Sequence, residues 1–136
     1  MRRATVVVAD RHNEIRTVFR EFFASSQHYR MVGEASNGVE VVDVVDRLKP
    51  DFVVLDSELP RRNGIEVTRI IKQRRASTRV IIATLFDDPL YKARALQAHA
   101  DAFLVKSSLK GSLESVFGVG LGEKKRRPRS AAPRSR

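Results

Sequence analysis

Residues 51–67 read DFVVLDSELPRRNGIEV and carry three local signals in a row. The apolar, β-branched run at 52–55 has the length and composition of a buried strand. Asp56 ends that strand on a carboxylate, and a helical pattern starts near Asn63-Gly64. The stretch therefore predicts a strand, an acidic group at its carboxyl end and a helix.

The same rhythm continues along the chain in both directions. Strand-length apolar runs recur at 5–9, 31–35, 80–84 and 102–105, each followed by a longer stretch with helical spacing. Single helices between nearly continuous apolar strands imply a parallel sheet, because short right-handed crossovers place helices on both of its faces. The predicted fold class is α/β, a doubly wound five-stranded parallel sheet.

The predicted helices carry their own signals. Asn37 followed by Glu40 fits a capping box at the start of the second helix, and Pro50 ends that helix. Asp88 before Pro89 is typical of the N-cap and first residue of the fourth helix. In the first helix one apolar stripe is expected to face the sheet, formed by Ile15, Val18, Phe19, Phe22 and Phe23.

The carboxyl-terminal region changes character after Phe117. Glycines at 118, 120 and 122 are poor helix residues, so we expect the final helix to end early. Residues 123–136 hold seven Lys or Arg and one Glu, a net +6 of the chain's +10, which leaves +4 for residues 1–122. We expect one folded domain over 1–122 and a basic, disordered tail over 123–136, and only that tail is a candidate for nucleic-acid binding.

Composition excludes several classes of protein. The chain has no cysteine, which rules out disulfides, thiolate metal sites and thiol nucleophiles. No apolar run approaches the ~18 to 20 residues of a membrane span, and the run after Met1-Arg2-Arg3 is too short for a signal peptide. We expect a cytoplasmic protein that does not act at a membrane.

Polar residues gather where the predicted strands end: Asp10, Arg11, Asp56, Thr84 and Lys106. In doubly wound sheets the ligand site lies beyond these carboxyl ends, where the strand order reverses. A carboxylate can form an acyl phosphate, and fixed cations and donors stabilise the charge on the transferred oxygens. Each residue alone is an ordinary turn residue, but the group predicts a site.

Four segments resemble the motifs of response-regulator receiver domains, in order and spacing over residues 5–117: VVVADRH, DFVVLDSELPRRNGIEV, VIIAT and ADAFLVKS. They are most similar to the branch that precedes helix-turn-helix output domains. The resemblance implies the flavodoxin-like strand order 2-1-3-4-5 and two-component signalling. A histidine kinase or phosphotransfer protein would phosphorylate Asp56, supported by Thr84 and Lys106, with Thr84 and Phe103 as the switch. The face of helix 4, strand 5 and helix 5 would then shift, and it is also the expected homodimer surface.

The predicted acidic pocket departs from the family pattern. The family draws Mg²⁺ ligands from an acidic pair after the first strand and from the acceptor, but here Arg11 follows Asp10. Asp10 and Asp56 against Arg11 and Lys106 sum to zero charge, so Mg²⁺ binding is doubtful. Arg11 either turns inward to pair with Asp56 or turns outward into solvent. Glu58 either replaces the lost ligand beside Asp10 and Asp56, pairs with Arg11, or is exposed.

Three further departures concern access and shape. Leu85 stands where the family prefers a small residue, and it either restricts access to Asp56 or simply packs. Ser107 follows Lys106 where many relatives have a cis proline, and we expect a trans bond because a cis one costs ~3 kcal/mol. His99 is expected to tolerate an unusual backbone dihedral at a helix end.

Three functions of different classes follow. A signalling receiver uses Asp10, Asp56, Thr84 and Lys106 but must tolerate Arg11. A pseudo-receiver keeps the scaffold and binds a protein partner or a second copy without phosphorylation, which explains Arg11 better. An enzyme like the aspartate-dependent phosphatases is disfavoured, because their second carboxylate is an aspartate and they carry cap insertions, so we expect a protein that is not an enzyme.

Overall fold

The computed structural model describes residues 2–118, so the predicted tail at 123–136 lies outside the described part of the chain. Five parallel strands form one sheet in the order β2-β1-β3-β4-β5. The strands are β1 (Ala4–Ala9), β2 (Tyr29–Ala35), β3 (Phe52–Asp56), β4 (Arg79–Thr84) and β5 (Ala102–Val105). The predicted fold class and strand order are confirmed.

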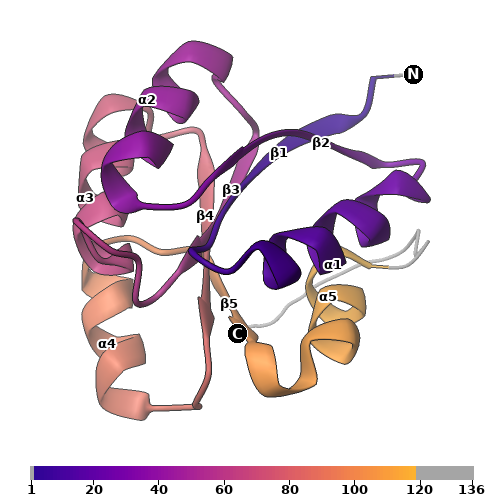
Figure 1. The fold of residues 1–136 in the computed structure, drawn as a ribbon. Coiled ribbons are helices and arrows are strands. Elements are labelled where there is room, and N and C mark those ends of the chain that lie inside the picture. Colours follow the sequence, from indigo (N-terminus) through magenta and orange to yellow (C-terminus); the bar gives the residue numbers. More distant parts are fainter. Residues whose placement is uncertain (1, 119–136) are drawn as a thin grey trace.

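Helices cover both faces of the sheet (Figure 1). They are α1 (Asn13–Ala24), α2 (Gly38–Leu48), α3 (Gly64–Arg74), α4 (Pro89–Gln97) and α5 (Leu109–Phe117), with a single 3₁₀ turn at Lys106–Ser108 before the last. α1 and α5 lie on one face, and α2, α3 and α4 lie on the other. Each of α1 to α4 connects two strands, and α5 follows β5, as the alternating pattern predicts.

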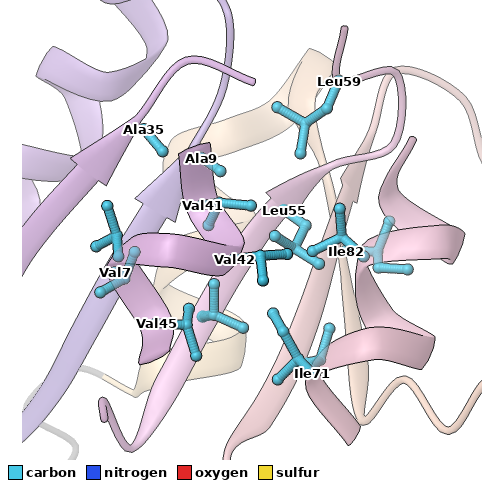
Figure 2. Packing of buried hydrophobic residues seen from close by; sticks show 14 of the residues in the cluster. Val7, Ala9, Ala35, Val41, Val42, Val45, Leu55, Leu59, Ile71 and Ile82 are labelled. Atoms are coloured by element: carbon cyan, nitrogen blue, oxygen red, sulfur yellow. The ribbon is translucent and has the colours of Figure 1, made fainter. Parts of the chain in front are cut away.

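The strands are buried on both faces because their side chains alternate between two cores. In β3, Val53 and Leu55 pack under α2 and α3, while Val54 packs with α1 and α5. Figure 2 shows the first core, where valines of α2 face Val7, Leu55 and Ile82. This packing fixes the sheet, so the strand ends hold polar side chains at defined places.

Several details of the first helix and the strands differ from the prediction. Val18 is 39% exposed, so it leaves the predicted stripe, whereas Phe19 and Phe23 are buried. β2 begins at Tyr29 rather than at residue 31, and the Tyr29 ring packs edge-on against Phe52 and Phe117 at 5.6 and 5.0 Å between centroids. An aromatic contact between distant segments extends this strand, and local periodicity does not report it.

The helix starts are confirmed with one correction. Asn37 caps α2 by accepting from the backbone N–H groups of Val39 and Glu40 at 3.0 and 2.8 Å. The Glu40 carboxylate does not return a hydrogen bond to the Asn37 N–H. It accepts instead from the Ser36 N–H at 2.7 Å, so the predicted capping box is wrong in this second hydrogen bond. Asp88 caps α4 with Pro89 as its first residue, as predicted.

The remaining backbone predictions are confirmed. α2 ends at Leu48, two residues before Pro50. α5 ends at Phe117, and Gly118 follows it with φ of 70°. His99 has φ of 75°, and the peptide bond before Ser107 is trans.

Candidate functional site

Three carboxyl strand ends bring their charged side chains into one buried cluster. Asp10 directly follows β1, Asp56 ends β3, and Lys106 directly follows β5. The Lys106 Nζ lies 2.6 Å from Asp10 Oδ2 and 2.9 Å from Asp56 Oδ1. Asp10 and Asp56 are only 1% and 4% exposed, so one ammonium bridges two carboxylates away from water.

Each carboxylate also accepts a hydrogen bond from one backbone N–H group. The His12 N–H donates to Asp10 Oδ1 at 2.8 Å, and the Glu58 N–H donates to Asp56 Oδ1 at 3.0 Å. With His12 neutral, two carboxylates and one ammonium leave a formal charge of −1. Buried charges are tolerated when they are paired and hydrogen-bonded, and these two carboxylates satisfy both conditions.

Neighbouring elements hold the site in place. Arg16 of α1 donates to the Asp10 carbonyl at 2.5 Å and to Glu34 Oε1 of β2 at 2.9 Å, tying the end of β1 to two elements. Gly64 at the start of α3 lies tight against the turn after β3, because a Cβ there would lie 3.0 Å from the Asp56 carbonyl oxygen. The turn after Asp56 therefore has little room to move toward α3.

A pocket of about 180 Å³ opens onto Asp56 and Lys106. Arg11, Glu58 and Leu85 also line it. A larger groove of about 760 Å³ lies between α1 and α5, but none of the strand-end charged residues lines it. The smaller pocket is therefore the candidate site.

The structure places the three pocket residues that depart from the family pattern. Arg11 is exposed and makes no hydrogen bond or ion pair with another described residue, so the outward alternative holds and Lys106 takes the place beside Asp56. Glu58 is also exposed. Leu85 is 53% exposed and lies at the pocket rim rather than packing inside.

Thr84 and Phe103 come from neighbouring strands, but Thr84 is engaged elsewhere. Its hydroxyl donates to the Phe86 carbonyl at 2.8 Å, which closes the start of the β4–α4 loop. The Phe103 ring is half-buried, and the Lys92 Nζ of α4 lies 5.4 Å from its centroid. In the register of the sheet Phe103 pairs with Ile82, two residues before Thr84.

Residues 2–118 contain no group of three or more Asp, Glu or His side chains that is arranged to hold a metal ion. The expected set of Asp10, Asp56 and Glu58 does not form such a group, and the Lys106 ammonium already binds two of its members. The residues present therefore do not fit a ready-made Mg²⁺ site.

Tyr91 also lines the pocket, and sequence reasoning missed it. It is the third residue of α4, where side chains project back toward the start of a helix and here toward the strand ends. Burial of the phenol, with smaller contributions from the charges of Asp56 and Glu58, raises the pKa of Tyr91 to about 12. The Asp88-Pro89 helix start was the signal that could have drawn attention to it.

Comparison with known proteins identifies the family of this chain. The family model for the response regulator receiver domain matches residues 6–117. An uncharacterized transcriptional regulatory protein, YhcZ of Bacillus subtilis, is 34% identical over 120 residues, covering 88% of this chain and 56% of the relative. The chain thus spans about half the length of the curated relatives it matches.

Solved structures show the same fold. A two-component response regulator of the LuxR family from Aurantimonas sp. SI85-9A1 has a TM-score of 0.79 at 29% identity, covering 85% of this chain and 83% of that one. The response regulator domain of Thermotoga maritima CheB has a TM-score of 0.73 at 32% identity, covering 83% and 85%. None of the described helices is long and apolar enough to cross a membrane. The chain belongs to the response regulator receiver domain family of two-component systems.

Proposed function

We propose that this receiver accepts a phosphoryl group on Asp56 and signals through the face formed by α4, β5 and α5. The observation that carries the proposal is the Lys106 ammonium, which lies 2.9 Å from a buried Asp56 carboxylate at the bottom of an open pocket. The donor is a histidine kinase or a phosphotransfer protein in the cytoplasm. The chain itself is a signalling module rather than an enzyme.

The chemistry requires little from the protein beyond position and charge. One carboxylate oxygen of Asp56 attacks phosphorus, a P–O bond forms, and the P–N bond of the donor's phosphohistidine breaks. The leaving imidazole nitrogen keeps the electron pair and takes a proton, while the carboxylate nucleophile has no proton to lose. Lys106 and the Glu58 N–H are fixed donors for the charge that develops.

Arg11 supports a phosphoryl transfer that depends little on Mg²⁺. The described side chains do not fit a ready-made Mg²⁺ site, and Arg11 places a cation at the pocket rim where the family has an acid. Its guanidinium has five donors in a planar fork suited to phosphate oxygens. We therefore expect phosphorylation of this chain to depend only weakly on Mg²⁺.

Signalling would start at the β4–α4 loop, whose first residues are held by the hydrogen bond from the Thr84 hydroxyl to the Phe86 carbonyl. Moving the Thr84 hydroxyl from the Phe86 carbonyl to the phosphoryl group would release the β4–α4 loop, and the Phe103 ring would follow. Such a change is a shift between two existing states with different affinity for the phosphoryl group. Exposed Phe86 and Leu90 lie on the part that moves.

The second candidate is a pseudo-receiver that binds a partner or a second copy without phosphorylation. Lys106 already binds both buried carboxylates, and Leu85 lines the pocket rim. Both features favour a pocket that is fixed in one state.

The deciding experiment is intact-mass spectrometry after incubation with phosphoramidate, with Mg²⁺ or with EDTA. We expect one phosphoryl adduct on the wild type under both conditions and none on Asp56→Ala. Arg11→Asp should gain a requirement for Mg²⁺. A wild type that stays unlabelled while Arg11→Asp is labelled would instead establish the pseudo-receiver.

A further inference from the structure

The Tyr91 hydroxyl is a buried polar group without a partner. Its Oη is shielded from solvent and forms no hydrogen bond with any residue among 2–118. The ring packs against the core beneath α2 and α3, so the phenol cannot simply swing into water. An unsatisfied buried hydroxyl is destabilising, and such a group in a folded protein calls for an explanation.

The position of this hydroxyl connects it with Asp56. Tyr91 lines the same pocket as Asp56 and Lys106. A Cβ on Gly64 would lie 3.5 Å from the Tyr91 Oη and 3.0 Å from the Asp56 carbonyl oxygen. The hydroxyl therefore lies beside the turn that follows the acceptor.

Apart from exposed Arg11 at the pocket rim, the donors named above around Asp56 already have acceptors. The Thr84 hydroxyl is bound to the Phe86 carbonyl, and Lys106 is divided between two carboxylates. The Glu58 N–H is bound to Asp56 Oδ1. A phosphoryl group on Asp56 adds three strong acceptor oxygens. The Tyr91 hydroxyl can donate to one of them without breaking an existing hydrogen bond.

We propose that the Tyr91 hydroxyl donates a hydrogen bond to the phosphoryl group on Asp56 and so joins the pocket directly to α4. The inference rests on the proposed function, since it needs a phosphoryl group at that residue. Asp88 fixes the first turn of α4 by accepting from the N–H groups of Leu90 and Tyr91 at 3.0 and 3.4 Å. A pull on Tyr91 therefore moves the helix start together with exposed Leu90.

The ionisation of Tyr91 agrees with the role of a donor. Burial raises the pKa of its phenol to about 12, so the proton is present throughout the physiological range. The nearby negative charges act in the same direction. A negative phosphoryl group would hold the proton more firmly still.

The test uses the full chain and BeF₃⁻ as a non-covalent mimic of the phosphoryl group, in buffer with Mg²⁺. Thermal unfolding is followed against BeF₃⁻ concentration for the wild type, Tyr91→Phe and Asp56→Ala. Tyr29→Phe is the matched control, since it removes the chain's other tyrosine hydroxyl, which belongs to the opposite core. Ligand binding to the folded state stabilises it by RT ln(1 + [L]/Kd), so the rise of the unfolding temperature with concentration reports the affinity.

The expected signature has two parts of opposite sign. Without BeF₃⁻, Tyr91→Phe unfolds at the same temperature as the wild type or higher, because an unsatisfied hydroxyl has been removed. With BeF₃⁻, it needs a roughly tenfold higher concentration for half-saturation, the loss of one hydrogen bond to a charged group. Tyr29→Phe keeps the wild-type half-saturation.

Two outcomes would overturn the inference and can be told apart. If BeF₃⁻ stabilises the wild type but not Asp56→Ala, and Tyr91→Phe responds like the wild type, the hydroxyl has no role at the phosphoryl group. If BeF₃⁻ leaves the wild type unchanged and phosphoramidate gives no adduct, the proposed function fails and the inference fails with it.

Discussion

Lys106 determines the charge balance of the pocket. Its side chain is 8% exposed and its ammonium binds both buried carboxylates, while the His12 imidazole Nδ1 lies 3.3 Å from Asp10 Oδ1. Topology predicted this meeting, because parallel strands end at one edge of the sheet. The orientation of Arg11 was not predictable, since it depends on whether Lys106 already fills the space beside Asp56.

Replacing Lys106 by methionine is expected to destabilise the fold by about 3 kcal/mol at neutral pH, because Asp10 and Asp56 would be left buried and unpaired. Urea unfolding measures the change. Lys110→Met is the matched control, since Lys110 is exposed on α5 and its loss should change stability by less than about 0.5 kcal/mol. Adding Asp10→Asn to Lys106→Met should recover part of the loss, and a Lys106→Met variant as stable as the wild type would contradict the charge argument.

At the scale of elements, α1 is tied to β2 by one acidic residue. Glu34 Oε1 accepts from Arg16 Nε at 2.9 Å, and Oε2 accepts from Arg20 Nε at 2.7 Å. The hydrogen bond from Arg20 holds the pKa of Glu34 below its usual value, against the opposing effect of burial. Because Arg16 also binds the Asp10 carbonyl, this link reaches the end of β1.

A lowered carboxyl pKa stabilises the folded state when the group is ionised. Glu34 therefore contributes fully above the ordinary glutamate pKa of 4.5, and the contribution disappears as the pH falls through the lower folded value. Glu34→Gln should cost about 0.2 to 1 kcal/mol at pH 7, as expected for partly exposed pairs, and the difference from wild type should shrink in acid. Denaturation at pH 7 and pH 3 measures it. Asp43→Asn, at an exposed position of α2, is the control, and an equal difference at both pH values would exclude the ion pair as the cause.

The elements also show what the sequence could and could not predict. All five strands and five helices were predicted, because apolar periodicity directly reflects burial on the sheet. The start of β2 at Tyr29 was missed, because it depends on rings from β3 and α5. Tyr91 was missed for a related reason: its hydroxyl reaches the pocket only through the placement of α4 over the turn at Gly64.

At the scale of the whole molecule, four of the six exposed large apolar side chains among the described residues belong to one segment of the chain. Leu85, Phe86, Leu90 and Leu96 are 53%, 75%, 66% and 56% exposed, and all belong to the β4–α4 loop or α4. The remaining large exposed apolar residues, Val18 and Leu48, are 39% and 37% exposed. Contiguous exposed apolar surface marks an interaction site more often than scattered residues do.

We therefore expect the phosphorylated full chain to dimerise through α4, and Leu90→Asp to keep it monomeric, because a carboxylate would be buried against apolar surface. Sedimentation equilibrium with and without phosphoramidate measures the mass. Val18→Asp places the same charge on α1, in the opposite helix layer, and should leave the dimer intact.

A dimer that survives Leu90→Asp but is lost with Val18→Asp would move the interface to the groove between α1 and α5, which Val18 lines. Dimerisation of the wild type without any phosphodonor, unchanged in Asp56→Ala, would mean that the α4 surface acts independently of the pocket, as a pseudo-receiver requires.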